Sequence, residues 1–160
     1  MTILKFPNPM LITATYEITV FGEELKVLLD AMYETMKAKN GLGLAANQVG
    51  LLHRMFVMEG PEGRINLVNP IIVWRSITAA NLREGCLSAP GDFVIVPSRS
   101  KEIHVRFQDE KGESQVKSLT GLHAVCVQHE IDHLNGQIFF ANKSIPKSKR
   151  QPLMKKWGIK

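Results

Sequence analysis

Two histidines with a glutamate beside the first mark the segment QHEIDHLNGQIF, residues 128–139. On an α-helix, His129 and His133 lie about 40° apart around the axis and about 6 Å apart along it, so both imidazoles can bind one metal ion. Glu130 lies at the edge of that face, where it can reach a group on the metal without binding the metal itself. A catalytic site of the zinc type needs three protein ligands and one open position. The third ligand must come from upstream, because no histidine, cysteine, aspartate or glutamate follows His133.

The chain has two cysteines, and both lie upstream of His133. Cys126 falls on the same helix face, but about 10.5 Å of helix rise separates it from His133, too far for both side chains to reach one tetrahedral ion. We therefore expect Cys126 to be a small buried packing residue. Cys86 lies in REGCLSAPGD, where glycine and proline indicate an extended segment that can bring a thiolate to a metal held elsewhere. We predict Cys86 as the third ligand, and a buried free thiol is the alternative. His123 is farther still from His133, and we expect it to be exposed or to cap the helix. His53 and His104 lie in strand-like segments with no partner at ligand spacing.

Two helices are predicted from the spacing of apolar residues. The histidine segment belongs to a helix over residues 122 to about 134, with Thr120 as its N-cap and Gly136 just past its end. Leucine and methionine recur every three or four residues within residues 22–41, which predicts a helix near the N-terminus.

Most of the chain between these helices has the pattern of short strands. Residues 41–50 are small and leave no room for a core in this interpretation. Strands are expected at residues 54–58, 65–68, 71–74 and 103–107 and near Val116, with turns at PEG and DEKG. Because the strands cluster instead of alternating with helices, we predict an α+β fold of mainly antiparallel strands around a central metal-binding helix, with an N-terminal helix.

Length and composition indicate one domain over residues 1–160, because 160 residues that are 44% hydrophobic can bury a core without disulfides. Two cysteines, no signal-like start and no long apolar run favour a cytoplasmic protein without a membrane segment. The net charge is +5, and from about residue 144 the chain ends in a short basic tail. Contact with RNA and a solvated, poorly ordered tail are both compatible with that charge.

Three segments together resemble the three signature motifs of the peptide deformylases. They are GLGLAANQ at residues 41–48, EGCLS at residues 84–88 and QHEIDH at residues 128–133. They occur in the order of that family with similar spacing, and the resemblance extends from the N-terminus to about Phe140. It implies removal of the formyl group from the N-terminal formyl-methionine of new polypeptides, with release of formate.

The resemblance also implies a set of roles. The family binds one divalent metal, usually Fe²⁺ in its active form and also Zn²⁺, Ni²⁺ or Co²⁺, and its ligands match Cys86, His129 and His133. Its catalytic glutamate matches Glu130. By the same resemblance, the Gln48 amide and the Leu87 N–H stabilise the oxyanion. The backbone around Gly41, Gly43 and Leu44 binds the substrate. The chemistry agrees, because donors aimed at a developing negative charge stabilise a transition state more than a substrate.

The chain departs from many bacterial relatives at two places. They carry an arginine seven residues past the motif cysteine, where this chain has Phe93. Some dock on the ribosome through a longer C-terminal helix, whereas here Pro146 and Pro152 are expected to interrupt a helix. A weak ribosome contact through the basic tail is therefore a hypothesis. We expect the nascent formyl-Met polypeptide to be the substrate. We also expect a monomer in the cytoplasm of a bacterium or phage-infected host. An organellar source stays open.

Two other functions remain alternatives. One is a different metallohydrolase or peptidase with the same histidine motif, although the longer protease signature requires a histidine where this chain has Phe139, which we expect in the core. The other is a metal-binding or RNA-binding module without catalysis, in which Glu130 and Gln48 would be incidental. Asp132 lies beside the histidine face, and we expect it to form an ion pair or to support a ligand.

Overall fold

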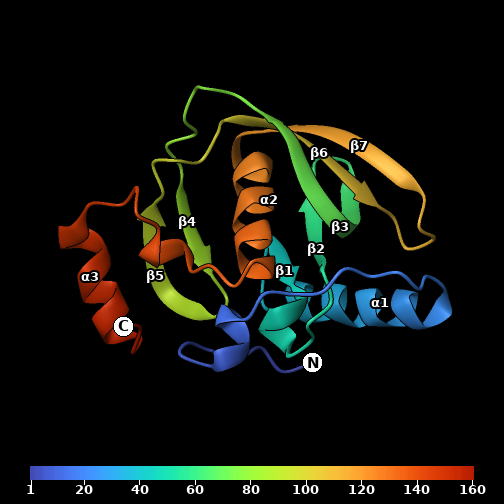
Figure 1. Ribbon diagram of the computed structural model, residues 1–160, viewed down its shortest axis with the longest axis horizontal. Helices are drawn as coiled ribbons and strands as arrows, with labels where there is room; N and C mark the ends of the chain where they lie inside the picture. Colours follow the sequence, from blue (N-terminus) through green and yellow to red (C-terminus); the bar gives the residue numbers. More distant parts are fainter.

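The computed structural model describes residues 1–160 and has an α+β fold in which every strand pairing is antiparallel. A five-stranded sheet has the order β1-β2-β3-β6-β7, and β4 and β5 form a separate two-stranded hairpin (Figure 1). The strands are β1 Gly43–Ala45, β2 Met55–Gly60, β3 Gly63–Arg75, β4 Arg83–Cys86, β5 Ala89–Ile95, β6 Glu102–Gln108 and β7 Ser114–Thr120. The helices are α1 Glu23–Ala38, α2 Gly121–Leu134 and α3 Lys147–Lys156. The predicted fold class is confirmed.

Helix α2 runs through the middle of the molecule, between the large sheet and the β4–β5 hairpin (Figure 1). Every residue from 124 to 134 except Asp132 is buried, so its histidines and glutamate lie inside the protein. Thr120 is the N-cap as predicted, although its side chain makes no capping hydrogen bond. Gly136 follows the C-terminal end with a φ of 69°, a left-handed conformation that glycine adopts without strain.

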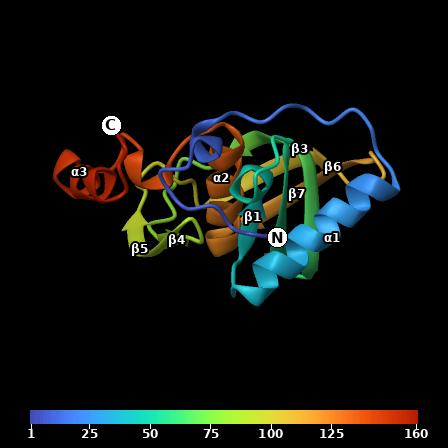
Figure 2. The same cartoon turned by 90° about the horizontal axis from the view of Figure 1, so that it is seen from below.

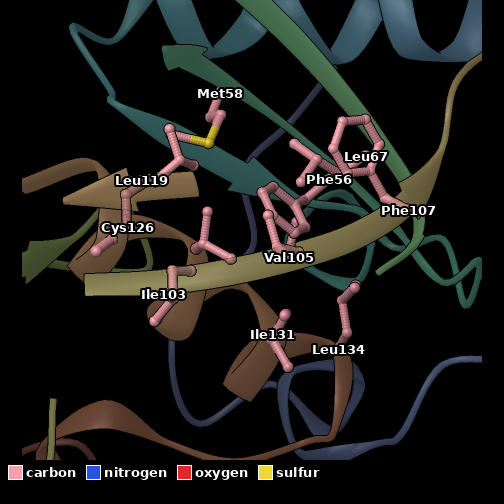
Figure 3. Close-up of a cluster of buried hydrophobic side chains, with 13 residues drawn as sticks. Phe56, Met58, Leu67, Ile103, Val105, Phe107, Leu119, Cys126, Ile131 and Leu134 are labelled. Atoms are coloured by element: carbon pink, nitrogen blue, oxygen red, sulfur yellow. The ribbon is translucent and has the colours of Figure 1, made fainter. Parts of the chain in front are cut away.

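The part of the sheet that is formed by β1 and β2 is buried on both faces. Successive side chains of a strand point to opposite faces, and in β2 Met55 and Val57 pack toward α1 while Phe56 and Met58 pack toward α2. Figure 3 shows the α2 side of this core, where side chains from β2, β6 and β7 meet Cys126, Ile131 and Leu134. Two-sided burial explains why β2 is apolar without alternation.

The predicted strands at residues 65–68 and 71–74 are a single strand, β3. Its register against β6 is irregular between Val68 and Ile71, and Asn69 has a positive φ of 50°. Hydrogen bonds of the Asn69 side chain compensate for the interrupted strand pairing. Its amide nitrogen donates to the Ile18 carbonyl and to Gln108, and its oxygen accepts from the Ile18 N–H. The asparagine-proline step that reads as a break between strands is therefore a bulge within one strand.

The prediction that residues 41–50 leave no room for a core is wrong. Residues 44–48 are all at most 2% exposed, in the short strand β1 and the 3₁₀ turn Ala46–Val49. The residues are small because α2 approaches closely. A Cβ on Gly43 would lie 2.6 Å from the Glu130 Oε1 and 2.8 Å from the Cys126 Sγ.

The expected interruption of a C-terminal helix by proline is also wrong. Helix α3 contains Pro152, and Pro146 is its N-cap. The helix packs through Leu153 and Trp157 onto a cluster that includes Phe6 and Phe140. Tertiary packing of this kind outweighs poor helix propensity. Figure 2 shows α3 at one end of the molecule beside β5, with α1 toward the other end. No helix of the fold combines the length and apolar character needed to cross a membrane.

Candidate active site

The three predicted metal ligands come together at the end of β4. The ligand atoms of Cys86, His129 and His133 all lie within 4.8 Å of one another, and the Cys86 Sγ is 3.2 Å from the His133 Nε2. One half-buried thiol and two buried imidazoles are a donor set that suits a divalent transition metal. The spacing of the three atoms fits a single ion, so the chemistry of this group agrees with a resident metal.

The other candidate ligands lie outside this group. Cys126 is 6% exposed and packs in the core against the sheet, and burial raises the pKa of its thiol well above the ordinary value. His104 stacks on Trp74, with 4.7 Å between the ring centroids. The prediction that Cys126 is a packing residue is confirmed.

A buried network of charges orients His129. Its Nδ1 donates to the Glu84 carboxylate at 2.9 Å, which leaves Nε2 free to face a metal. Arg99 donates to both oxygens of Glu84, at 2.7 and 3.0 Å, and to Asp132 at 2.6 Å. The expected ion-pair role of Asp132 is confirmed. Asp132 pairs with Arg99, and Arg99 also binds the Glu84 carboxylate that orients His129.

These contacts also determine the charge of each group. Burial acts to raise the pKa of Glu84, but hydrogen bonds from His129 and Arg99 bring it below the ordinary value, so Glu84 is ionised. Burial lowers the pKa of His133 well below the ordinary value. His133 is therefore neutral, the state in which an imidazole binds a metal.

Aromatic rings surround the two imidazoles. Phe139 is 1% exposed and its ring centroid lies 5.0 Å from that of His129, while Phe6 stacks on His133 at 6.5 Å. The prediction that Phe139 belongs to the core is confirmed. These rings exclude water from the protein side of the site and hold the imidazoles in place.

Glu130 is buried beside the ligand group and is incompletely satisfied. Its Oε2 atom has no hydrogen-bond partner within the protein. Burial raises its pKa to about 7. A carboxylate with a pKa near neutrality and a free oxygen can both accept and return a proton.

Two hydrogen-bond donors lie near Cys86. The Gln48 side chain is held by the Ala45 N–H, which donates to its Oε1 at 2.9 Å, and its Nε2 donates to the Ser88 hydroxyl at 3.1 Å. The same Nε2 lies 3.5 Å from the Cys86 Sγ. The Leu87 N–H donates to no group within the protein, whereas the Leu87 carbonyl accepts from Lys5. Both donors predicted from the sequence are therefore beside the ligand group.

These residues line a cleft with a volume of about 450 Å³. We call Glu84, Cys86, His129 and Glu130, which line the cleft, together with the buried His133 beside them, the floor of the cleft. We call Arg83, Asp92 and Phe93 on the hairpin its mouth. Gly41 and Gly43 lie along the opposite wall.

Strand β1 borders the cleft and pairs with β2 on one edge only, so its other edge is unpaired. Gly43 is the residue of β1 that lines the cleft, and the Leu44 side chain is fully buried in the cluster against α1. A larger hollow of about 920 Å³ near α1 and β7 has no comparable group of metal ligands.

The model of the polypeptide deformylase family matches residues 1–150. The chain belongs to this family. A peptide deformylase of Phenylobacterium zucineum is 39% identical over 159 residues, which cover 96% of this chain and 92% of that protein. A peptide deformylase-like protein of Agrobacterium fabrum is 38% identical over 156 residues, 97% of this chain and 93% of that protein. The crystal structure of Arabidopsis thaliana peptide deformylase 1B has a TM-score of 0.90 at 36% identity and covers 99% of this chain and 88% of that one.

As a member of the deformylase family, the chain is a metal-dependent hydrolase that removes the N-formyl group from nascent polypeptides. Sequence reasoning did not assign roles to Glu84, Ser88 or Arg99 in this deformylase site. Glu84 and Ser88 stand two positions before and after Cys86, and alternation along an extended segment is a signal for such neighbours. Arg99 is 15 residues from Glu84 and 33 from Asp132, and no spacing rule connects residues that far apart.

Proposed function

We propose that the chain deformylates formyl-methionyl polypeptides with Cys86, His129 and His133 as metal ligands and Glu130 as the group that transfers protons. The observation that carries this assignment is the unpartnered Oε2 of buried Glu130 beside three ligand atoms that fit one ion. We also propose which metal is bound: we expect Fe²⁺, with Zn²⁺, Ni²⁺ and Co²⁺ as substitutes.

A bound divalent ion supplies Lewis acidity and lowers the pKa of a water molecule toward neutrality. Glu130 accepts the proton of that water and returns it to the leaving amine nitrogen, and its unpartnered Oε2 is the atom available for this proton. The water oxygen forms a bond to the formyl carbon, which becomes tetrahedral, and the formyl oxygen gains negative charge. The carbon–nitrogen bond then breaks and gives formate and the free amine. The Gln48 amide and the free Leu87 N–H donate to that oxygen and stabilise it.

The free edge of β1 provides the binding mode that we propose for the substrate. A peptide in extended form adds to an unpaired strand edge through main-chain hydrogen bonds, which do not depend on its side chains. Gly43 lets the peptide backbone approach closely because no side chain covers this position. Gly41 and the backbone of Leu44 extend the same wall. This mode suits an enzyme that must accept many sequences after methionine.

The deciding experiment measures formate release. The purified chain is loaded anaerobically with Fe²⁺ or with Zn²⁺, its metal content is determined, and it is mixed with formyl-Met-Ala-Ser. Formate is expected from the formylated peptide, and acetyl-Met-Ala-Ser serves as the control for the acyl group. Absence of formate from fully metallated protein refutes the proposal. Cleavage within an unformylated peptide supports the alternative of a peptidase.

A ribosome contact through α3 is a second proposal, supported by the exposed lysines of this region. Lys147 and Lys149 are exposed at the start of the helix, and Lys155 at its end. Contact with RNA phosphates depends strongly on salt. We expect weak co-sedimentation with ribosomes at low salt that is lost at high salt and reduced in Lys147→Glu/Lys149→Glu. Absence of binding at low salt contradicts this contact.

We further propose that the chain acts as a monomer in the cytoplasm. Its proposed substrate, a polypeptide that still carries the initiating formyl group, is made in that compartment. Size-exclusion chromatography with light scattering tests the monomeric state, with a mass near 17.9 kDa as the expected result.

A further inference from the structure

The hairpin wall at the mouth of the cleft carries an arginine stacked on an aromatic ring. Arg83 is exposed at the start of β4, and its guanidinium carbon lies 5.4 Å from the centroid of the Phe93 ring. Phe93, on β5, is 57% exposed, and its ring lies against the backbone of Gly85, where an added Cβ would come within 2.6 Å of it. The glycine thus lets the ring lie flat on the hairpin, and the ring provides a platform for the guanidinium.

Arg83 is also the exposed cation of this cleft that has no ion-pair partner. Asp92 is bound by the Lys156 ammonium at 2.7 Å and by the Trp157 N–H at 2.7 Å. Glu84 is bound by Arg99 and His129. Arg83 forms no ion pair, although it lines the same cleft as these carboxylates. The mouth of the cleft therefore presents a positive charge that no protein carboxylate neutralises.

A peptide that lies in the cleft must pass this charge. Phe93 and Arg83 on the hairpin line the same cleft as Gly43 on β1 and the ligands Cys86 and His129. When the formyl group is on the floor, the residues after methionine extend between the walls. Their side chains point alternately to opposite sides in an extended peptide. Some of them therefore face the hairpin.

We propose that Arg83, held on Phe93, is a specificity determinant that favours an acidic side chain among the residues that follow formyl-methionine. This inference rests on the proposed function, and it adds a preference to a site that otherwise recognises backbone. The guanidinium attracts a carboxylate and repels an ammonium at the same position. Because Arg83 is exposed, the gain for a carboxylate over a neutral side chain is about two- to fivefold.

The experiment compares kcat/KM for formate release from a set of peptides. Formyl-Met-Ala-Ala-Ala-amide is varied by placing Glu, Gln or Lys at the second, third or fourth residue. The amidated end removes the C-terminal carboxylate, so that only a side chain carries the negative charge. The same peptide with a free carboxylate shows whether that group is recognised at the same place. We expect Glu to exceed Gln and Gln to exceed Lys at one of the three positions, by less at high salt than at low salt.

Charge reversal at Arg83 tests the residue itself. Arg83→Glu is expected to invert the order so that Lys exceeds Glu, and Arg83→Lys to keep part of the preference. Arg106→Glu is the matched control, because Arg106 is exposed on β6, outside the cleft, and its reversal changes the net charge equally. Formate release from the all-alanine peptide should stay within about twofold in Arg106→Glu, because this residue lies outside the cleft.

The outcomes separate the two proposals. If the unmodified protein releases formate but the order of Glu, Gln and Lys is the same in Arg83→Glu, then Arg83 does not contact the substrate and the inference is wrong. An equal change in Arg106→Glu also contradicts it, because the effect then follows net charge. If fully metallated protein releases no formate from any peptide, the proposed function itself has failed.

Discussion

The floor and the mouth of the cleft differ in how their charges are balanced. On the floor, Glu84 is enclosed by Arg99 and His129, and both members of the Glu84–Arg99 pair are 5% exposed. At the mouth, the Lys156 side chain is 55% exposed and that of Asp92 is 14% exposed, and Arg83 has no partner. The charges of Glu84 and Arg99 on the floor are thus paired inside the protein, whereas the mouth keeps a charge available to a ligand.

This difference separates chemistry from selection. A buried charge that loses its partner destabilises its whole surroundings, because the remaining charge has no solvent to compensate it. An exposed charge interacts weakly and through a screening solvent, so it can change without disturbing the fold. We therefore expect substitutions on the floor to impair metal binding or turnover for every substrate, and substitutions at the mouth to leave both nearly intact.

The largest effect is expected for Glu130→Gln. This change keeps the shape of the side chain and removes its capacity to carry a proton, so formate release should fall by about 10²–10⁴-fold. Metal content, measured by atomic emission, should remain at the level of the unmodified protein because Glu130 is outside the ligand group. Turnover above one tenth of the original value means that another group transfers the proton.

Loss of a ligand is the next test of the floor. Cys86→Ala removes the thiolate from a three-ligand site, so most of the metal should be lost on dialysis and activity should fall with it. Cys126→Ala is the matched control, because the same thiol is removed from a core position outside the ligand group. If Cys86→Ala retains its full metal content, the assigned ligand set is incorrect.

Glu84→Gln tests the support of the floor. The change weakens the hydrogen bond to the His129 Nδ1 and leaves Arg99 with Asp132 as its only charged partner. We expect metal affinity or kcat to drop by about 10–100-fold, the usual cost of losing such a supporting group. Metal titration and thermal unfolding separate the two contributions. An unchanged metal affinity and kcat would show that His129 does not need this carboxylate.

The smallest effect is expected at the mouth, for Asp92→Asn. Hydrogen bonding to Lys156 lowers the pKa of Asp92, so its carboxylate is ionised at neutral pH and pairs with an exposed lysine. Exposed pairs of this kind contribute little. Formate release from a neutral peptide should change by less than about twofold, and the melting temperature should fall only slightly. A loss of metal would break the distinction between floor and mouth.

The fold was predictable where one segment carries its own signals. Helix α2 has a cap residue at Thr120 and a glycine after its end, and β6 alternates Ile103, Val105 and Phe107 inward. Helix α3 was not predictable, because its stability comes from apolar side chains that meet Phe6 and Phe140 from distant parts of the chain. The β4–β5 hairpin was missed for a related reason, since glycine and proline obscure the strand pattern around Cys86.

The candidate site divides in the same way. The pair His129 and His133 follows from helix spacing, and the exclusion of Cys126 follows from the rise of the same helix. The contribution of Arg99 could not be inferred, because its contacts join three segments that only the folded chain brings together. The catalytic roles of Glu130 and Gln48 stay predictions that agree with their positions.

Asp92 attaches the β4–β5 hairpin to Lys156 and Trp157, and this contact affects the order in which parts of the enzyme can form. The two groups that bind Asp92 are encoded 64 and 65 residues after it, and His133 is encoded 47 residues after Cys86. At 5–20 residues per second, a ribosome needs roughly 3–13 s to synthesise the stretch from Asp92 to Lys156. During synthesis the metal ligands are therefore all present before the hairpin that carries Cys86 acquires its last attachments.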